Sequence, residues 1–183
     1  MVMVLAAPPR MAIVTRPDVR VPQGGRVEIR RAFRADVPAI VALLVDDDLG
    51  RQRETTEQPL DDGYWAAFDA IDADPNHQLV VLEADDGDVV GCLQLTFLPY
   101  LTFRGGWRAQ IEAVRIASDR RGTGLGCVLF EWAIDEARRR DCHLVQLTTN
   151  AERPDALAFY ESLGFAVTHQ GMKLYLQGDV TGR

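Results

Sequence analysis

The sequence has little of what builds metal sites or disulfide frameworks. Its three cysteines, Cys92, Cys127 and Cys142, are odd in number and far apart, and none belongs to a C-x-x-C pair. This distribution is typical of reduced core thiols in a cytoplasmic protein. The three histidines are equally scattered and show no metal-ligand spacing. We therefore expect neither a structural disulfide nor a bound metal.

Long apolar runs and an excess of positive charge are also missing. No apolar run approaches the roughly 20 residues of a membrane helix, and the short apolar start over residues 1–7 lacks the basic flank of a signal peptide. The formal net charge of −7 argues against broad binding to nucleic acid or to an anionic membrane. It fits a cationic small substrate better. We expect a cytoplasmic protein with neither a nucleic-acid nor a membrane partner.

Length and composition predict one globular domain preceded by an extension. With 183 residues, 47% hydrophobic and 26% charged, the chain can bury a substantial core. Residues 1–26 contain four prolines and the pair Gly24-Gly25, without helical or strand periodicity. We expect a flexible N-terminal extension there. Residues 27–178 would form the domain and residues 179–183 a C-terminal tail.

From Val27 onward, strand and helix patterns alternate. Asp36 is expected to cap a helix from Val37 to Leu44, and Asp86-Gly87 marks a two-residue hairpin. The expected strands cover residues 27–33, 79–83, 89–98, 109–117, 144–149, 165–168 and 172–176. Further helices are expected over residues 60–71, 125–140 and 154–164. In the strand at 109–117, Gln110, Glu112 and Val114 are expected to share one face. The whole pattern is mixed α/β.

The sharpest feature is a glycine-rich turn between an expected strand and an expected helix. It has the sequence Arg121-Gly122-Thr123-Gly124-Leu125-Gly126. Glycines allow the backbone to approach a ligand closely, and the first N–H groups of a helix have no internal partner and carry partial positive charge. With Arg120 and Arg121 adding formal charge, the turn predicts a pyrophosphate site.

Two nucleotide-binding motifs do not fit this turn. A P-loop needs Gly-Lys-Ser/Thr, and no lysine is present here. A dinucleotide fingerprint needs a third glycine where Cys127 stands. The plain alternative is a strand-to-helix turn whose arginines lie in solvent.

In this context the sequence resembles the GNAT superfamily of N-acetyltransferases. The family's motif R/Q-x-x-G-x-G/A is present in full at 121–126, after a strand and before a helix. Ala156, Phe159-Tyr160 and Leu163-Gly164-Phe165 match the downstream pattern A-x-x-x-Y-x-x-x-G-F. The resemblance covers about residues 27–177. It implies an α/β fold with a mostly antiparallel, twisted central sheet of six to seven strands flanked by about four helices.

The resemblance also implies acetyl-CoA as the acyl donor. Val114, Arg115 and Ile116 would offer backbone groups to its pantetheine arm, and the amides of residues 121–126 would hold its pyrophosphate. One position departs from the family pattern. Many members place an asparagine seven residues before the tyrosine, where this chain has Arg153. Asn150 lies nearby but off register, so the contact to the cofactor arm stays open between the two.

Two side chains are candidates for acid and base catalysis. An alkylamine with a pKa of about 10.4 is almost fully charged at neutral pH, so transfer to an amine benefits from a base. Glu112, two residues before Val114, is the candidate base; alternatively it pairs with Arg108, Arg115 or another cation. By resemblance, Tyr160 would sit near the sulfur and protonate the departing thiolate; alternatively it is a packed core aromatic.

Direct transfer is favoured over a covalent enzyme intermediate. The backbone N–H of Val114 could bind the oxyanion. Cys127 and His143 suggest a nucleophile and its base, but nothing in the sequence places them together. Cys127 falls in the region of the apolar stripe of the helix expected at 125–140.

The acceptor is expected to meet the first two helices and their loop, residues 46–62. This stretch is acidic and suits a polyamine, an aminoglycoside-like amine or a protein N-terminus; a solvated acidic face is the alternative. Its acidic residues are Asp46, Asp47, Asp48, Glu54, Glu57, Asp61 and Asp62. Residues 99–107 are candidates for another wall of the site or for a homodimer interface.

The function predicted is acetyl-CoA-dependent N-acetyl transfer to the primary amine of a small molecule or a protein N-terminus. The alternative is a non-catalytic acyl-CoA sensor or interaction module.

Overall fold

The computed structural model describes residues 16–20, 26–47, 50–150 and 154–176. They form one sheet with the strand order β1-β2-β3-β4-β5-β6, in which every neighbouring pair is antiparallel except β5 and β6. The strands are β1 (Arg16–Arg20), β2 (Arg26–Arg31), β3 (His77–Ala84), β4 (Val89–Pro99), β5 (Trp107–Ile116) and β6 (Cys142–Leu147). The α-helices are α1 (Val37–Val45), α2 (Asp62–Ala73), α3 (Thr102–Gly105), α4 (Leu125–Arg139) and α5 (Pro154–Ser162). The predicted α/β class and mostly antiparallel sheet are therefore confirmed.

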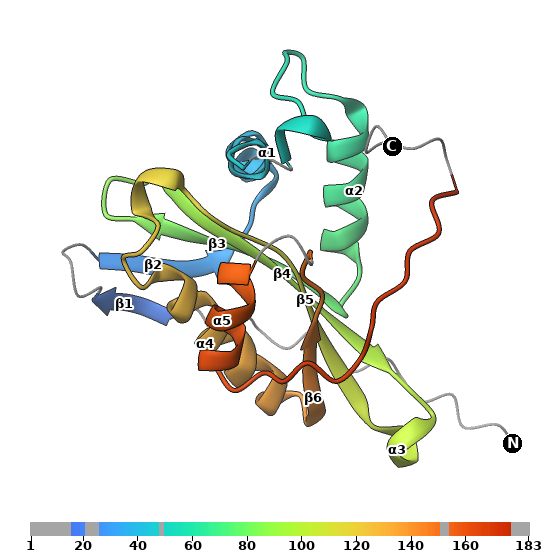
Figure 1. Ribbon diagram of the computed structural model, residues 1–183. Helices are drawn as coiled ribbons and strands as arrows, with labels where there is room; N and C mark the ends of the chain where they lie inside the picture. The colour runs from blue at the N-terminus through green and yellow to red at the C-terminus, as the bar shows by residue number, and fades with distance from the viewer. Residues whose placement is uncertain (1–15, 21–25, 48–49, 151–153, 177–183) are drawn as a thin grey trace, which may run out of the picture.

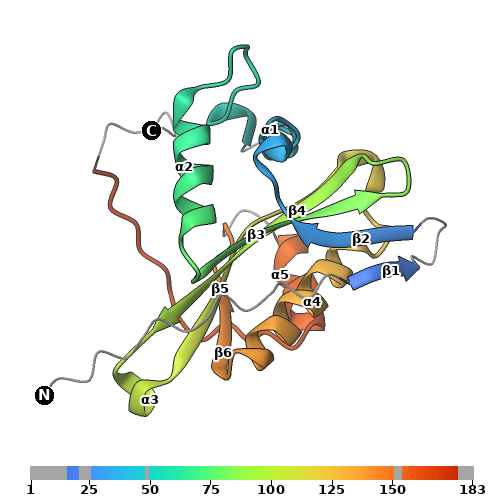
Figure 2. The same cartoon turned by 180° about the vertical axis from the view of Figure 1, so that it is seen from behind.

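The helices form a layer on each face of the sheet (Figures 1 and 2). On one face, α1 and α2 pack over the middle strands through an apolar cluster that includes Ile40, Val41, Phe68, Val81 and Cys92. On the other face, α4 lies over the sheet and α5 packs against α4. The site described below lies where β5 and β6 meet these two layers.

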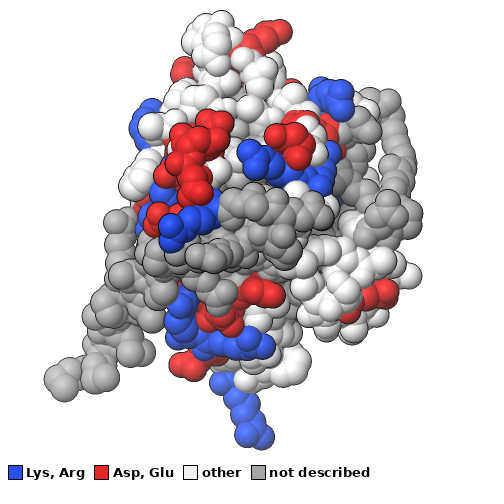
Figure 3. Space-filling model, turned by 90° about the vertical axis from the view of Figure 1, so that its left-hand side faces the viewer, with Lys and Arg blue, Asp and Glu red and all other residues white. Residues whose placement is uncertain are grey.

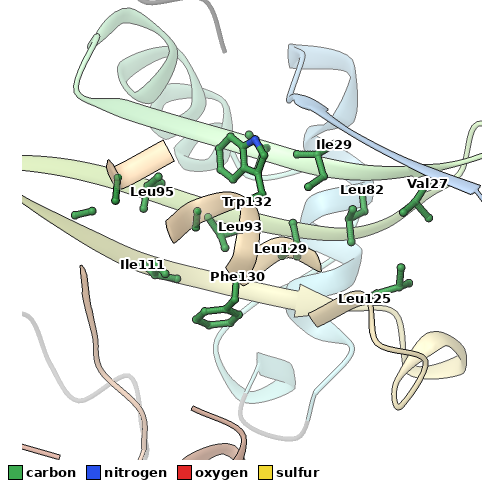
Figure 4. Packing of buried hydrophobic residues seen from close by; sticks show 14 of the residues in the cluster. Val27, Ile29, Leu82, Leu93, Leu95, Ile111, Leu125, Leu129, Phe130 and Trp132 are labelled. Atoms are coloured by element: carbon green, nitrogen blue, oxygen red, sulfur yellow. The ribbon is translucent and has the colours of Figure 1, made fainter. Parts of the chain in front are cut away.

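Helix α4 is the main support of its face. Its apolar stripe is buried against strands β2 to β5, with Leu129, Phe130, Trp132 and Ala133 each at most 1% exposed. Figure 4 shows Leu129, Phe130 and Trp132 among the side chains of the strands. The predicted helix at 125–140 is thus confirmed, and the burial fixes the helix relative to the strand that precedes the glycine turn.

A buried polar anchor holds the far end of α4. The Glu136 carboxylate accepts a hydrogen bond from Gln78 Nε2 at 3.0 Å and pairs with Arg139. The neighbouring Arg140 guanidinium stacks on the Phe97 ring at 4.0 Å. Since Glu136 and Gln78 are both 1% exposed, this pairing compensates for taking their polar groups out of water.

Asp36 does not cap α1 through its side chain as the sequence predicted. Its carboxylate instead accepts hydrogen bonds from the Phe33 N–H at 2.6 Å and from the Arg30 guanidinium at 2.7 and 2.9 Å. Burial alone would raise the pKa of Asp36, but these hydrogen bonds and the charge of Arg30 lower it overall. These contacts therefore add to the free energy of unfolding in full above the ordinary pKa of aspartate. Their contribution is lost as the pH falls through the lowered pKa of Asp36.

Two expectations about the ends of the chain are wrong. The strands predicted at 165–168 and 172–176 are absent, and these described residues have no regular secondary structure. Their apolar side chains find no strand to pack on, with Val167 69% and Leu174 85% exposed. Conversely, β1 lies within the predicted extension 1–26 and pairs with β2. Residues 1–15, 21–25 and the tail 179–183 lie outside the described residues.

Acidic and basic side chains are interspersed on the face seen in Figure 3, without one continuous patch of either sign among the described residues. Within the part of the chain that the structure describes, no helix is long and apolar enough to cross a membrane. The same residues contain no group of three histidine, cysteine or acidic side chains that could hold a metal ion.

Two N-terminal deletions test the boundary of the domain. Removing residues 1–15 should leave the Tm unchanged, because that stretch has the proline-rich, aperiodic composition of an extension. Removing residues 1–25 also removes β1 and strips β2 of one partner, so the Tm should fall by about 5 °C. Thermal unfolding followed by circular dichroism measures both. Equal Tm values for the two deletions would show that β1 adds nothing to the sheet.

Candidate active site

A β-bulge in β5 shapes the site. Cys92 on β4 is paired with Arg115, but Gln94 is paired with Glu112, so two residues of β5 stand opposite Leu93. Within the bulge, Ala113 has a φ of 52°, which is rare for a residue other than glycine. A bulge of this kind bends the strand and increases its twist.

The bulge coincides with the end of the β5–β6 pairing. The parallel ladder stops at Ile111 and Leu147, while β5 continues to Ile116. Among the described residues, the edge of β5 beyond Ile111 therefore has no strand partner on the β6 side. Ala117 N–H bonds to the carbonyl of Val90 at 2.9 Å, and alternation along an antiparallel ladder then directs the N–H groups of Val114 and Ile116 toward this opening.

The glycine-rich turn has the backbone of an anion site. Gly122 and Gly124 have φ of 77° and 91°, values that glycine adopts without strain. No heavy atom lies within 4 Å of where a Cβ would stand on Gly122. Helix α4 begins directly after Gly124, so its first three N–H groups, those of Leu125 to Cys127, have no intrahelical partner. These residues fit a pyrophosphate group.

The arginines around the turn have structural partners. Arg121 donates from Nε to the Ile116 carbonyl at 3.2 Å and pairs with Asp46 after α1. Arg115 pairs with Asp47 at 3.2 Å. The predicted formal charge at the turn is therefore largely balanced by carboxylates. The two ion pairs instead tie the end of α1 to the end of β5.

Tyr160 belongs to an aromatic group between α4 and α5. Its ring centroid lies 5.5 Å from that of Phe130 and 6.4 Å from that of Phe165. Phe159 approaches the first turn of α4 so closely that a Cβ on Gly126 would lie 3.4 Å from its ring. Tyr160 thus has the aromatic packing that the alternative interpretation expected, next to the helix that follows the glycine turn. Asn150 is exposed, and Arg153 lies outside the described residues.

Glu112 lies at the start of the opening, on an exposed position of β5. Its carboxylate accepts a hydrogen bond from Gln110 Nε2 at 2.9 Å, and Gln110 Oε1 accepts one from Gln146 Nε2 at 2.7 Å. Among the described residues, Glu112 forms no ion pair with Arg108 or Arg115. Arg108 stacks 4.2 Å from the Tyr100 ring centroid instead, and Arg115 is engaged by Asp47.

Sequence reasoning missed the role of Gln110 and Gln146. The only available signal was that Gln110 and Glu112 share one face of the strand. The same reasoning placed Val114 on that face too, which is wrong. Val114 packs against the cluster under α4, because the bulge shifts the alternation by one residue.

Several carboxylates predicted to meet the acceptor have other partners. Asp46 and Asp47 are engaged by arginines, as described above. Glu54 accepts a hydrogen bond from the Tyr64 hydroxyl at 2.9 Å, and Asp61 caps α2 by accepting from the Gly63 N–H at 2.7 Å. Asp48 lies outside the described residues. The acidity of residues 46–62 thus serves local structure to a large extent.

The cysteines do not form a nucleophilic site. Cys127 stands in the first turn of α4, whereas His143 follows the end of that helix, so roughly 18 Å of helix lies between them. His143 Nδ1 lies 2.7 Å from the Trp107 carbonyl oxygen. Burial raises the pKa of Cys92 to about 12. The preference for direct transfer over a Cys127–His143 pair agrees with this arrangement.

Comparison with known proteins gives a consistent picture. A family profile described as "Acetyltransferase (GNAT) family" matches residues 39–165. The aminoalkylphosphonate N-acetyltransferase of Salmonella typhimurium is 30% identical over 143 residues, which are 78% of this chain and 86% of that protein. The streptothricin acetyltransferase of Streptomyces lavendulae is 32% identical over 172 residues, 83% of this chain and 88% of that protein. A solved structure described as a transcriptional regulator from Bacillus halodurans C-125 is 50% identical, with a TM-score of 0.79 over 82% of this chain and 99% of that chain.

Proposed function

The chain belongs to the acetyltransferase (GNAT) family and is an acetyltransferase, and on that premise we propose that it moves an acetyl group from acetyl-CoA to the primary amine of a small molecule. One observation carries the proposal. The opening beside the β5 bulge, with its free backbone N–H groups, lies at the end of the strand that leads into the glycine turn. A long donor can place its pyrophosphate at the glycine turn and its thioester at the opening beside the bulge.

The donor would be held mainly by backbone groups. Residues 121–126 and the first turn of α4 would bind the pyrophosphate, while the Ile116 N–H would bind the arm and leave the Val114 N–H for the acyl group. Arg115 would contribute less directly, since its side chain is engaged by Asp47. Asn150 and Arg153 remain candidates for a further contact. The donor supplies an acyl carbon activated as a thioester.

The residues of the chain then divide the chemistry between the two faces of the sheet. Glu112 accepts a proton from the acceptor amine, directly or through a water, as the new C–N bond forms. The Val114 N–H donates a hydrogen bond to the acyl oxygen as negative charge develops there. Tyr160 gives its phenolic proton to the sulfur as the C–S bond breaks. Base and acid thus come from opposite faces, with the acyl group between them.

A small-molecule acceptor is favoured over a protein N-terminus. The two curated relatives described above are named for aminoalkylphosphonates and streptothricin, which are small molecules that carry amines. The alternative of a non-catalytic acyl-CoA-binding module makes a different prediction, namely binding without turnover. Acetyl-CoA consumption measured against a library of amines and short peptides separates the two. Binding of acetyl-CoA with no consumption by any amine would contradict the proposal.

Gly124→Asp should abolish acetyl-CoA binding. Acetyl-CoA should raise the Tm of the parent, since a ligand that binds only the native state stabilises it. The variant adds bulk and negative charge where the pyrophosphate would lie, so the shift should vanish. Gly87→Asp is a matched control, because Gly87 also has a positive φ, 89°, but lies in the β3–β4 turn. Both variants should lose some Tm without ligand, and only the control should keep the shift. A normal shift in Gly124→Asp would place the donor elsewhere.

Tyr160→Phe should lower kcat and leave acetyl-CoA binding intact. The ring and its packing on Phe130 remain, while the proton donor is lost. We expect kcat to fall by roughly 10- to 1000-fold, the range of general acid catalysis. Steady-state rates and the acetyl-CoA-induced Tm shift provide the two readouts. Tyr175→Phe is the control, because Tyr175 is 53% exposed on the irregular C-terminal segment. A Tyr160→Phe enzyme with parental kcat would exclude the acid role.

Glu112→Gln should produce an enzyme whose activity recovers as pH rises. The shape is kept but the base is lost, so turnover then depends on the fraction of acceptor that is already neutral. That fraction grows about tenfold per pH unit below the amine pKa. Rate–pH profiles of the variant, the parent and Glu131→Gln, an exposed position on α4, test this. A purely structural role for Glu112 would instead lower the Tm and leave the shape of the profile unchanged.

A further inference from the structure

Six polar residues lie together on one face of the sheet, and we name this group the polar floor. They are register partners across strands β3 to β6: His77, Thr96, Gln110 and Gln146 in one row, and Gln94 and Glu112 in the next. Two rows of polar side chains in register are unusual for a sheet face that is partly covered by helices, because such a face is normally apolar.

The polar floor lies on the face opposite α4. Ala109 and Ile111, on either side of Gln110, point into the cluster under α4, so Gln110 and Glu112 point the other way. This is the face that α1 and α2 cover farther along, where Val81 and Cys92 are buried in the second apolar cluster. None of the six polar residues belongs to that cluster. The floor is therefore the part of this face that the apolar side chains of α1 and α2 leave uncovered.

The glutamines of the floor keep unused hydrogen-bonding capacity. A primary amide has two N–H donors and two acceptor sites. Gln146 donates once to Gln110, and Gln110 donates to Glu112 and, at 3.5 Å, to the Ile111 carbonyl oxygen. Among the described residues these are their side-chain hydrogen bonds, so Gln146 keeps one donor and its two acceptor sites and Gln110 keeps one acceptor site, while both residues are half-buried. Such groups lower the free energy of binding when a ligand supplies matching partners.

The floor ends where the proposed chemistry takes place. Glu112 is the first residue of β5 beyond its pairing with β6, and the donor would occupy the opening from the α4 side. An acceptor must then approach from the other face, over the floor. This step rests on the proposed function.

We infer that the polar floor binds the acceptor and selects a primary amine that carries a hydroxyl or amide group within two or three bonds of its nitrogen. Gln110 Nε2 lies 2.9 Å from the Glu112 carboxylate. A group that close to a nitrogen held at Glu112 therefore reaches the amides of Gln110 and Gln146. An apolar group in its place leaves the remaining donor and acceptor sites of those half-buried amides unsatisfied, and sites of this kind discriminate strongly. Gln110 and Gln146 are thus specificity-determining residues.

The test uses isopropanolamine and isobutylamine, which differ only by a hydroxyl in place of a methyl group. The readout is the ratio of their kcat/KM values with acetyl-CoA, because a general loss of catalysis cancels in a ratio. The parent should prefer isopropanolamine by about tenfold or more. Gln110→Leu and Gln146→Leu should each bring the ratio close to one, and Gln170→Leu, at an exposed position outside the floor, should not change it. If Gln110→Leu fails to fold, Gln146→Leu alone decides.

The outcomes separate the two proposals. A ratio that collapses in the floor variants and persists in the control supports the inference. A parental ratio near one, or an unchanged ratio in both floor variants, overturns it while leaving acetyl transfer intact. If the parent consumes acetyl-CoA with neither amine nor with any member of a wider amine library, the proposed function is overturned, and the inference that rests on it is overturned as well.

Discussion

The organisation of the site depends on one local distortion, the extra residue in β5 at Ala113. A regular β5 would alternate its side chains without interruption and could continue its ladder with β6. With the bulge, two residues stand opposite Leu93, the strand bends, and pairing with β6 stops at Ile111. The backbone N–H groups beyond that point are the ones proposed to bind the donor. A defect in hydrogen bonding between strands is thus the origin of the site proposed for the donor.

Two ion pairs hold the distorted strand in place. Arg115 and Arg121 flank the end of β5, and their partners Asp47 and Asp46 follow α1. Asp46 also accepts a hydrogen bond from the Ser118 N–H at 2.7 Å. Because these contacts join segments about 70 residues apart in sequence, they set the position of the glycine turn relative to the sheet. The charges near the site serve mainly to fix geometry, and the groups proposed to bind the pyrophosphate are backbone amides.

The sequence was informative where function depends on local backbone pattern. The glycine turn, the amphipathic α4 and the tyrosine motif on α5 could each be predicted from neighbouring residues, since their structure depends on local conformation and periodicity. Features set by contacts distant in sequence could not be predicted. The bulge has no glycine or proline to mark it, so Val114 was assigned to the wrong face. Alternating apolar residues at 165–176 predicted strands, but a strand also needs a partner edge, and sequence periodicity does not report one. The polar floor is a property of register across four strands, which no single segment contains.

The buried anchor at Glu136 has a mechanical consequence. Helix α4 has 15 residues and is about 22 Å long, with the glycine turn at one end and the Glu136–Gln78 contact near the other. A helix lying on a sheet can roll about its own axis, and apolar packing resists rolling only softly because side chains can interdigitate in more than one way. A directional polar contact fixes the roll angle. The direction of the first N–H groups of α4 is therefore set partly by the Glu136 side chain, which lies three helical turns beyond the glycine turn.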